Sequence, residues 1–169
     1  GALYKGRQVG TIGDASGFSL MSGKSFAVGE AGILFTRDHG VYERAILFGH
    51  YARGDEITDP QLQRFAGLPA GGYKYRMNQL SSAFGRVQLK YYPQQMAEIQ
   101  KAMNYFCDQV ASLPGVRPIR PAKGSGSTRG GWFFSTCGYA PEELGGLSVH
   151  RFAEAVAAEG VTCTAGCNR

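Results

Sequence analysis

Hydrophobic residues recur at intervals of three or four in the second half of the chain, where they predict the longest amphipathic helix. The positions that follow this spacing are Met96, Ile99, Met103, Phe106, Val110 and Leu113. Pro114 and Gly115 close the pattern, and such a stripe is typical of the core face of a helix. Residues 77–90 have a mostly helical spacing with Asn78 as the N-cap, and Pro93 predicts a break or a new helix start.

Short apolar runs between turn residues predict strands in the first part of the chain. Residues 16–21 indicate a short buried strand around Phe18 and Leu20, and residues 32–36 form a β-branched and aromatic run of strand length. A turn and a short helix from about 41 to 48 follow. From 52 to 72 the chain has Gly, Asp and Pro without periodicity, which predicts a long connection or flap.

The last third of the chain alternates strand and helix patterns. The predicted elements are strands at 116–121 and 132–139, a helix that Ser148 caps and Gly160 ends, and a strand-like run at 161–164. The Gly- and Ser-rich stretch 123–131 is a flexible connection and lacks the Gly-Lys-Ser/Thr ending of a phosphate-binding loop. Residues from about 91 onward therefore form an α+β unit of their own.

Composition narrows the class of protein without naming it. The 169 residues suit one domain, or a small domain plus a piece of another, and 43% hydrophobic with 18% charged residues is a globular balance. No apolar run is long enough to cross a bilayer and no signal peptide is visible, so we expect a cytoplasmic protein without a membrane partner. The net charge of +5 is dispersed, which argues against nucleic-acid binding.

The cysteines and histidines do not form a recognisable site. Neither group has the close spacing of a zinc site, so we expect free thiols, no bound metal and no catalytic histidine. The residues concerned are Cys107, Cys137, Cys163, Cys167, His39, His50 and His150. We expect an internal segment of a longer protein, because the sequence has no initiator Met and begins and ends within predicted elements.

Lys24 is the residue whose surroundings point to chemistry. It lies in the stretch 17–26 among small residues between two apolar runs, as a Schiff-base lysine would. An amine attacks an aldehyde only when it is neutral, and we expect Gly23, Phe26 and Phe18 to enclose it in that form. The alternative is a surface lysine in a glycine-rich turn.

Two separated blocks around and after Lys24 carry a resemblance to a known family. The first comprises residues 4–14, 18–20, Lys24 and 29–32, and the second comprises residues 72–80, 82–85 and 87–89. Together they are similar to the DegT/StrS-type sugar aminotransferases, which are fold type I pyridoxal phosphate enzymes. The resemblance implies an α/β fold: the end of the large cofactor-binding domain at 1–50, a connecting flap and interface helix at 51–90, and a truncated α+β small C-terminal domain at 91–169.

The resemblance also implies roles for four residues. Lys24 bonds to the pyridoxal phosphate aldehyde and, once displaced by the amino donor, moves a proton to and from carbon. Ser19 matches a serine that binds the cofactor phosphate, the alternative being a strand-end serine bonded to backbone. Lys74 stands where many members have Asn and reaches the phosphate in a neighbouring subunit, and Arg76 faces the same site. For Arg76 the alternative is an ordinary surface ion pair.

The implied function is amino transfer from glutamate or glutamine to a nucleotide-linked keto sugar by a homodimer with a shared active site. The other implied contacts of the cofactor would lie before Gly1, so we expect the isolated chain to hold pyridoxal phosphate weakly. Two alternatives remain open at this point. One is a pyridoxal phosphate-dependent sugar dehydratase, and the other is a noncatalytic chain that serves as an interaction module.

Overall fold

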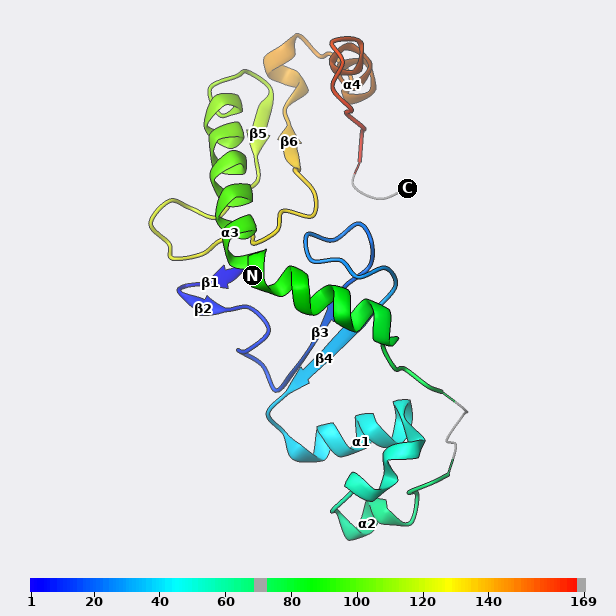
Figure 1. Cartoon of the computed structure of the whole chain (residues 1–169). Coiled ribbons are helices and arrows are strands. Elements are labelled where there is room, and N and C mark those ends of the chain that lie inside the picture. The colour runs from blue at the N-terminus through cyan, green and yellow to red at the C-terminus, as the bar shows by residue number, and fades with distance from the viewer. Residues whose placement is uncertain (69–72, 167–169) are drawn as a thin grey trace.

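The computed structural model describes residues 1–68 and 73–166 and mixes helices with short strands (Figure 1). Within these residues the strands form antiparallel pairs of two, β1 with β2, β3 with β4 and β5 with β6. The strands are β1 Leu3–Tyr4, β2 Arg7–Gln8, β3 Ala15–Ser19, β4 Gly32–Thr36, β5 Val116–Pro118 and β6 Cys137–Tyr139. The helices are α1 His39–Gly49, η1 Tyr51–Glu56, α2 Pro60–Gln63, α3 Gln79–Val110, η3 Pro141–Leu144 and α4 Val149–Ala158.

The β3–β4 pair confirms one predicted strand and shifts the other. β4 has the predicted bounds, and β3 runs from Ala15 to Ser19 in continuous register with it, with Ser19 opposite Gly32. The expectation of a buried strand is wrong for Phe18, whose side chain is 39% exposed, whereas Leu20 just beyond the strand is buried. A two-stranded pair without a covering layer buries little, which accounts for the difference.

The predicted connection at 52–72 contains helical turns rather than an unstructured flap, as far as the structure describes it. η1 follows α1 almost directly, and α2 begins at Pro60 after the N-cap Asp59. The short helices have no periodicity that a sequence window could detect, because α2 has only 4 residues and η1 only 6. Ile46, Leu47 and Ile57 form the small buried cluster that holds this region together.

Glu43 joins α1 to the start of α2 from the inside. Its side chain is only 1% exposed, and its carboxylate accepts hydrogen bonds from the Thr58 backbone N at 2.5 Å and the Thr58 hydroxyl at 2.7 Å. The backbone N of Asp59 donates as well, at 3.2 Å. These donors, the Thr58 hydroxyl first, hold the pKa of Glu43 below its ordinary value. The carboxylate thus completes the backbone hydrogen bonding of the turn before α2.

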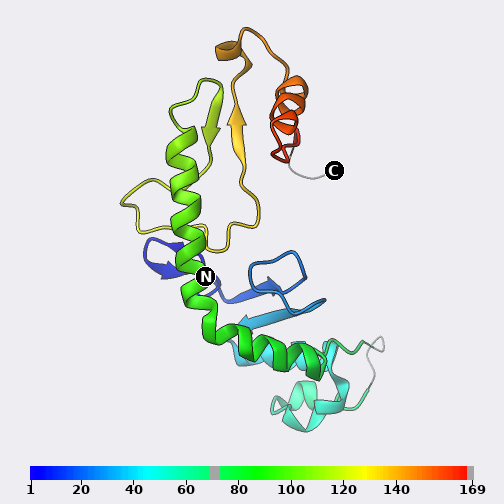
Figure 2. The same cartoon turned by 45° about the horizontal axis from the view of Figure 1, so that its top comes forward.

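α3 is one helix of 32 residues and corrects the prediction of a break at Pro93. It begins after Asn78, whose Oδ1 accepts from the Ser81 backbone N at 2.8 Å, as predicted. Proline removes one backbone hydrogen bond, and a long helix absorbs this loss as a bend. Figures 1 and 2 both show α3 changing direction part way along its length.

The apolar stripe of α3 is buried less than its pattern suggests. Met96, Ile99 and Met103 are half-buried, and the side chains of Phe106 and Leu113 are 41% and 50% exposed. The expectation of a core stripe is therefore only partly met within this chain. Cys107, which the apolar spacing does not single out, is the most deeply buried hydrophobic side chain of the helix, at 1% exposed.

The C-terminal unit contains the predicted helix but fewer strand residues than predicted. Ser148 caps α4 as expected, through a hydrogen bond from the Arg151 backbone N to its hydroxyl at 3.3 Å. The strand predicted at 132–139 is reduced to Cys137–Tyr139. At its predicted start, Trp132 has a left-handed backbone with φ of 47°, which a residue in a ladder does not adopt. The run 161–164 forms no strand.

The first residues of the chain pack against this C-terminal unit. The Thr128 backbone N donates to the Leu3 carbonyl at 2.9 Å, and the Leu3 backbone N donates to the Thr128 hydroxyl at 3.0 Å. A further hydrogen bond joins the Gly6 backbone N to the Gly126 carbonyl at 2.7 Å. The loop at 123–131 is thereby fixed in place by segments far from it in the sequence.

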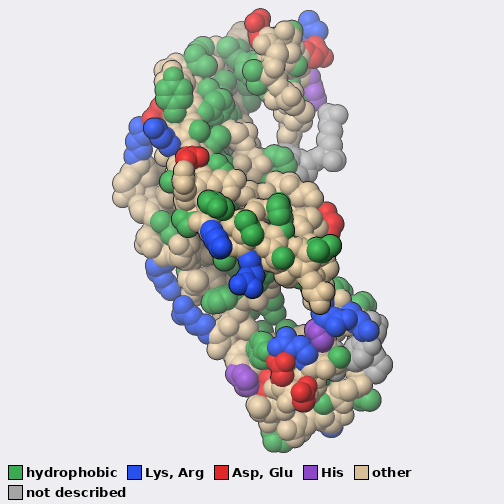
Figure 3. Space-filling view, viewed as in Figure 1, with side chains coloured by type: hydrophobic (Ala, Val, Ile, Leu, Met, Phe, Trp, Pro, Cys, Tyr) green, Lys and Arg blue, Asp and Glu red, His purple; other side chains and the backbone are tan. Residues whose placement is uncertain are grey.

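The chain exposes more surface than a compact protein of its mass. Its accessible area is 11,819 Å², whereas a compact monomer of 18.2 kDa exposes about 8,100 Å². Figure 3 shows hydrophobic side chains gathered on the face that carries the second half of α3 and β5. Such an excess is typical of a segment that packs against further protein. No helix in the described part of the chain is long and apolar enough to cross a membrane.

Candidate active site

Lys24 lies on the connection between β3 and β4, residues 20–31, which we call the lysine loop. Its ends are drawn together by hydrogen bonds from the Leu20 backbone N to the Ala31 carbonyl at 2.8 Å and from the Val28 backbone N to the Leu20 carbonyl at 2.9 Å. The Lys24 backbone N donates to the Met21 carbonyl at 2.9 Å and forms a tight turn. Ser19 thus stands at the base of the loop and Lys24 in its outer part.

The first half of α3 holds the lysine loop from one side. The Ser81 hydroxyl donates to the Val28 carbonyl at 2.7 Å, and the Gln88 Nε2 donates to the Ala27 carbonyl at 2.6 Å. Gly85 lies between them along the helix, where a Cβ would come within 3.0 Å of the Val28 Cγ1 atom. A larger residue at 85 would push the loop away, so the glycine permits this close approach.

The aromatic surroundings of Lys24 differ from those predicted. The ring of Phe26 packs edge-on against Tyr92, with 5.1 Å between centroids, and the ring of Phe18 lies against Gly10. The side chain of Lys24 is half-buried, and its Nζ lies 3.1 Å from the centroid of the Phe133 ring. Phe133 was absent from the predicted site because no local spacing links it to a loop so distant in sequence.

Ser19 is exposed, and its Oγ accepts a long hydrogen bond of 3.4 Å from the Met21 backbone N. The alternative interpretation, a strand-end serine bonded to backbone, therefore describes part of its environment. A bond of this length leaves the hydroxyl able to donate to, and accept from, another group. Of the four predicted residues, Ser19 at the end of β3 and Lys24 in the lysine loop thus lie on one continuous segment.

Lys74 and Arg76 lie on a different segment, just before α3. Lys74 forms an isolated bridge with His50, the Tyr75 backbone N donates to the Gly49 carbonyl at 2.8 Å, and both basic side chains are exposed. Alternation along an extended chain turns Lys74 and Arg76 to one face. In the described part of the chain Arg76 makes no hydrogen bond or ion pair, so the alternative of a surface ion pair finds no support. Gly72, which begins this predicted block, lies outside the described residues.

The opposite face of this segment is aromatic. Tyr73 and Tyr75 stack with 5.4 Å between ring centroids and an angle of 10°, and Phe48 from α1 lies 5.0 Å from Tyr73. All three side chains are more than 40% exposed. This segment therefore presents its aromatic and basic side chains outward. On its basic side there is only a small hollow of about 10 Å³, lined by His50, Ala52, Lys74 and Arg76.

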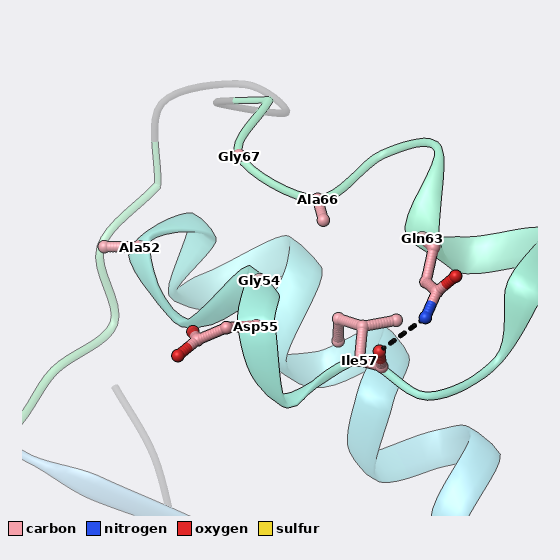
Figure 4. Close-up of a pocket in the computed structure, with 7 residues that line it drawn as sticks. All are labelled: Ala52, Gly54, Asp55, Ile57, Gln63, Ala66 and Gly67. Atoms are coloured by element: carbon pink, nitrogen blue, oxygen red, sulfur yellow. Dashed lines mark hydrogen bonds between the residues drawn. The ribbon is translucent and has the colours of Figure 1, made fainter.

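A larger open pocket, about 650 Å³, lies between η1 and the turns after α2 (Figure 4). Its lining residues are Ala52, Gly54, Asp55, Ile57, Gln63, Ala66 and Gly67. Gln63 reaches across one side, where its Nε2 donates to the Ile57 carbonyl at 3.3 Å. None of the four predicted site residues lines this pocket, and among the described residues that do, Asp55 is the only one with a charged side chain.

The cysteines that looked scattered in sequence gather in the C-terminal unit. Cys107 on α3, Cys137 on β6 and Cys163 after α4 are free thiols, as predicted, and Cys167 lies outside the described residues. Burial raises the pKa of the Cys137 thiol, with smaller contributions from Cys107 and Cys163. Among the described residues no group of His, Cys, Asp or Glu side chains is arranged to hold a metal ion.

Comparison with known proteins places these features in a family. The family model of the DegT/DnrJ/EryC1/StrS aminotransferases matches residues 1–165. The chain is 36% identical over 90 residues to the GDP-perosamine synthase of Escherichia coli O157:H7, covering 53% of this chain and 23% of that protein. It is 29% identical over 121 residues to the GDP-perosamine synthase of Caulobacter vibrioides, covering 72% of this chain and 30% of that protein. The chain thus spans less than a third of these relatives.

A solved structure supports the fold. The E. coli GDP-4-keto-6-deoxy-D-mannose-3-dehydratase with bound hydrated PLP superposes with a TM-score of 0.78 at 22% identity. The match covers 97% of this chain and 43% of that chain. At this identity the likeness shows the fold alone.

Proposed function

The chain belongs to the DegT/DnrJ/EryC1/StrS aminotransferase family, and we propose that it is the lysine-bearing segment of a pyridoxal phosphate-dependent enzyme. The reaction we propose is transfer of an amino group from glutamate or glutamine to a keto sugar, nucleotide-linked. The observation that carries this proposal is the placement of Lys24, half-buried on a short loop that α3 holds through Ser81 and Gln88.

The residues of the lysine loop fit one wall of a pyridoxal phosphate site. Lys24 supplies an amine that is positioned by its loop, and Ser19 supplies a hydroxyl that can donate to a phosphate oxygen. Bound pyridoxal phosphate would supply an aldehyde for the amine and an electron-withdrawing ring that accepts electrons from the substrate carbon. The relatives that share the fold extend well beyond the length of this chain, and the remaining wall would come from that additional sequence.

Lys24 would perform two tasks in the reaction. Its Nζ would first hold the cofactor by covalent attachment, and the amino donor would then displace it. The freed Nζ would take a proton from the donor carbon that bears the amino group and pass it to the former aldehyde carbon within the same half-reaction. In the second half it would move a proton in the opposite direction, onto the sugar carbon that receives the amino group. A loop fixed at both ends suits this role, since proton transfer requires the base to stay within hydrogen-bond reach.

Lys74 and Arg76 would act on the neighbouring subunit of a homodimer. Their exposure, on a segment separate from the lysine loop, supports a role outside this chain's own site. Lys74 would place a positive charge near the partner's cofactor phosphate, and Arg76 would hold an anionic group or the local backbone. We also propose the division into 1–50, 51–90 and 91–169 as the end of a large domain, a connecting flap with an interface helix, and a small C-terminal domain.

The presence of Lys24 favours transamination over the alternatives. An amine that attaches the cofactor and then moves the proton is what transamination requires, and this chain has such an amine in a loop that the fold holds firmly. A noncatalytic interaction module would have no need for a lysine in this position.

The decisive experiment is Lys24→Ala in the full-length enzyme, with Lys90→Ala as the matched control on exposed α3. We expect Lys24→Ala to abolish the visible absorbance of the bound cofactor. We also expect it to lower turnover by about 10²- to 10⁴-fold, because the proton-transfer group is lost. Absorbance spectra and amino-transfer assays measure the two effects. A Lys24→Ala enzyme with normal transamination would refute the assignment.

A further inference from the structure

We propose that Phe133 is a positioning residue for Lys24. The face of its aromatic ring would hold the ammonium group of Lys24. The Nζ of Lys24 lies 3.1 Å from the centroid of the Phe133 ring, within the range of a cation–π contact. Within the described part of the chain, the Lys24 Nζ makes its contact with this ring. The inference rests on the proposed function, because it gives the contact a role in a reaction in which Lys24 takes up a proton.

The segment that carries Phe133 is held on both sides. Arg129 donates from Nη1 to the Ile119 carbonyl at 2.8 Å and from Nη2 to the Phe134 carbonyl at 3.2 Å. Trp132 is buried at 8% exposed, and its Nε1 donates to the Gln100 Oε1 on α3 at 3.1 Å. Phe133 therefore follows a residue whose backbone and side chain are both fixed.

Two features bring this segment against the lysine loop. A Cβ on Gly131 would come within 1.8 Å of the Ser25 Oγ, so only glycine allows the approach. Trp132 has φ of 47°, a conformation that a tryptophan adopts only when the surrounding structure enforces it. This turn directs the chain so that the Phe133 ring reaches both Lys24 and the position of Gly23.

The ring distinguishes the two protonation states of the amine. The quadrupole of an aromatic face attracts an ammonium and has no comparable attraction for a neutral amine. Phe133 would therefore stabilise Lys24 after its Nζ has taken a proton from the substrate carbon, and would keep the charged group beside the loop until the proton is returned. The ring of the neighbouring Phe134 also contacts that of Phe133, with 4.2 Å between centroids and an angle of 58°.

The test measures the reactivity of Lys24 in the full-length enzyme freed of cofactor. Trinitrobenzenesulfonate labels neutral amines, and peptide mass spectrometry gives the rate at Lys24 relative to exposed Lys90 and Lys101 on α3. For Phe133→Leu we expect the relative rate at Lys24 to rise about two- to fivefold, the effect of losing an exposed cation–π contact. Phe133→Tyr keeps the aromatic face and should label like the wild type. Phe134→Leu removes the adjacent exposed ring and should change the rate at Lys24 less than Phe133→Leu does.

Several outcomes would overturn the inference. An unchanged relative rate in Phe133→Leu would do so, as would an equal rise in Phe133→Tyr. A uniform rise at Lys24, Lys90 and Lys101 would reveal unfolding in place of a specific contact and would also count against it. The proposed function fails separately: borohydride reduction of the full-length enzyme with pyridoxal phosphate should add the cofactor to Lys24, and absence of that adduct would refute the function whatever the labelling shows.

Discussion

The lysine loop and the segment 73–76 differ in how the fold holds them, although both were predicted to bind one cofactor. The lysine loop is closed by backbone hydrogen bonds at its base, tied to α3 through Ser81 and Gln88, and covered by Phe133. The segment 73–76 joins the rest of the chain through a bridge to His50, a hydrogen bond to Gly49 and ring contacts of its two tyrosines with Phe48. Its aromatic and basic side chains point outward on opposite faces.

This difference indicates which parts of the site the chain builds by itself. A group that must stay within hydrogen-bond reach of a reacting carbon needs a rigid support, and the lysine loop has one. A group that acts on another subunit must be presented at the surface, and its own contacts can be few. Substitutions in the two regions should therefore have different effects. Those in α3 beneath the lysine loop should lower the free energy of unfolding, whereas those at 73–76 should change cofactor binding alone.

Gly85→Val should have the largest effect on stability. The added side chain would collide with Val28, 3.0 Å from a Cβ at this position, and overpacking of this kind lowers the free energy of unfolding by about 1–3 kcal/mol. Urea denaturation of the chain followed by circular dichroism measures the change. Ala83→Val on the exposed part of the same helix is the matched control and should cost no more than about 0.6 kcal/mol of helix propensity. Equal losses in the two variants would show that the contact between α3 and the loop carries no strain.

Gln88→Leu should have an intermediate effect. It leaves the Ala27 carbonyl without its donor, and loss of one such hydrogen bond lowers the free energy of unfolding by about 0.5–1.5 kcal/mol. Hydrogen exchange of the amides at 24–28 should accelerate in the same variant. Gln94→Leu removes an exposed bond to Glu98 on the same helix and serves as the control. Unchanged exchange in Gln88→Leu would mean that α3 does not hold the loop.

Lys74→Ala should have the smallest effect on stability and a clear effect on binding. A surface substitution of this kind changes the free energy of unfolding by less than about 0.5 kcal/mol. In the dimeric full-length enzyme, loss of a charged phosphate contact should raise the cofactor Kd about tenfold or more. Equilibrium titration by absorbance measures it. An unchanged Kd would assign Lys74 to the solvated surface and would remove the distinction drawn between the two regions.

Local patterns predicted much of the secondary structure. The strand at 32–36, the α1 helix, the Asn78 cap of α3 and the Ser148 cap of α4 all depend on neighbours within a few residues, and the structure contains each. Two of the failures centre on single residues. Pro93 was expected to end a helix that the flanking turns instead continue, and the strand expected from 132 is displaced by the fixed turn at Trp132.

The sequence by itself determined the family, the loop that carries Lys24 and the nearness of Ser19, because these depend on residue identity and short spacing. The tertiary structure alone decided which aromatic ring meets the amine. Phe26 and Phe18 are close to Lys24 in sequence but pack against Tyr92 and Gly10, whereas Phe133 reaches the Nζ from a distant segment. Side-chain contacts across a fold follow from where packing places whole segments, and no local pattern encodes that placement.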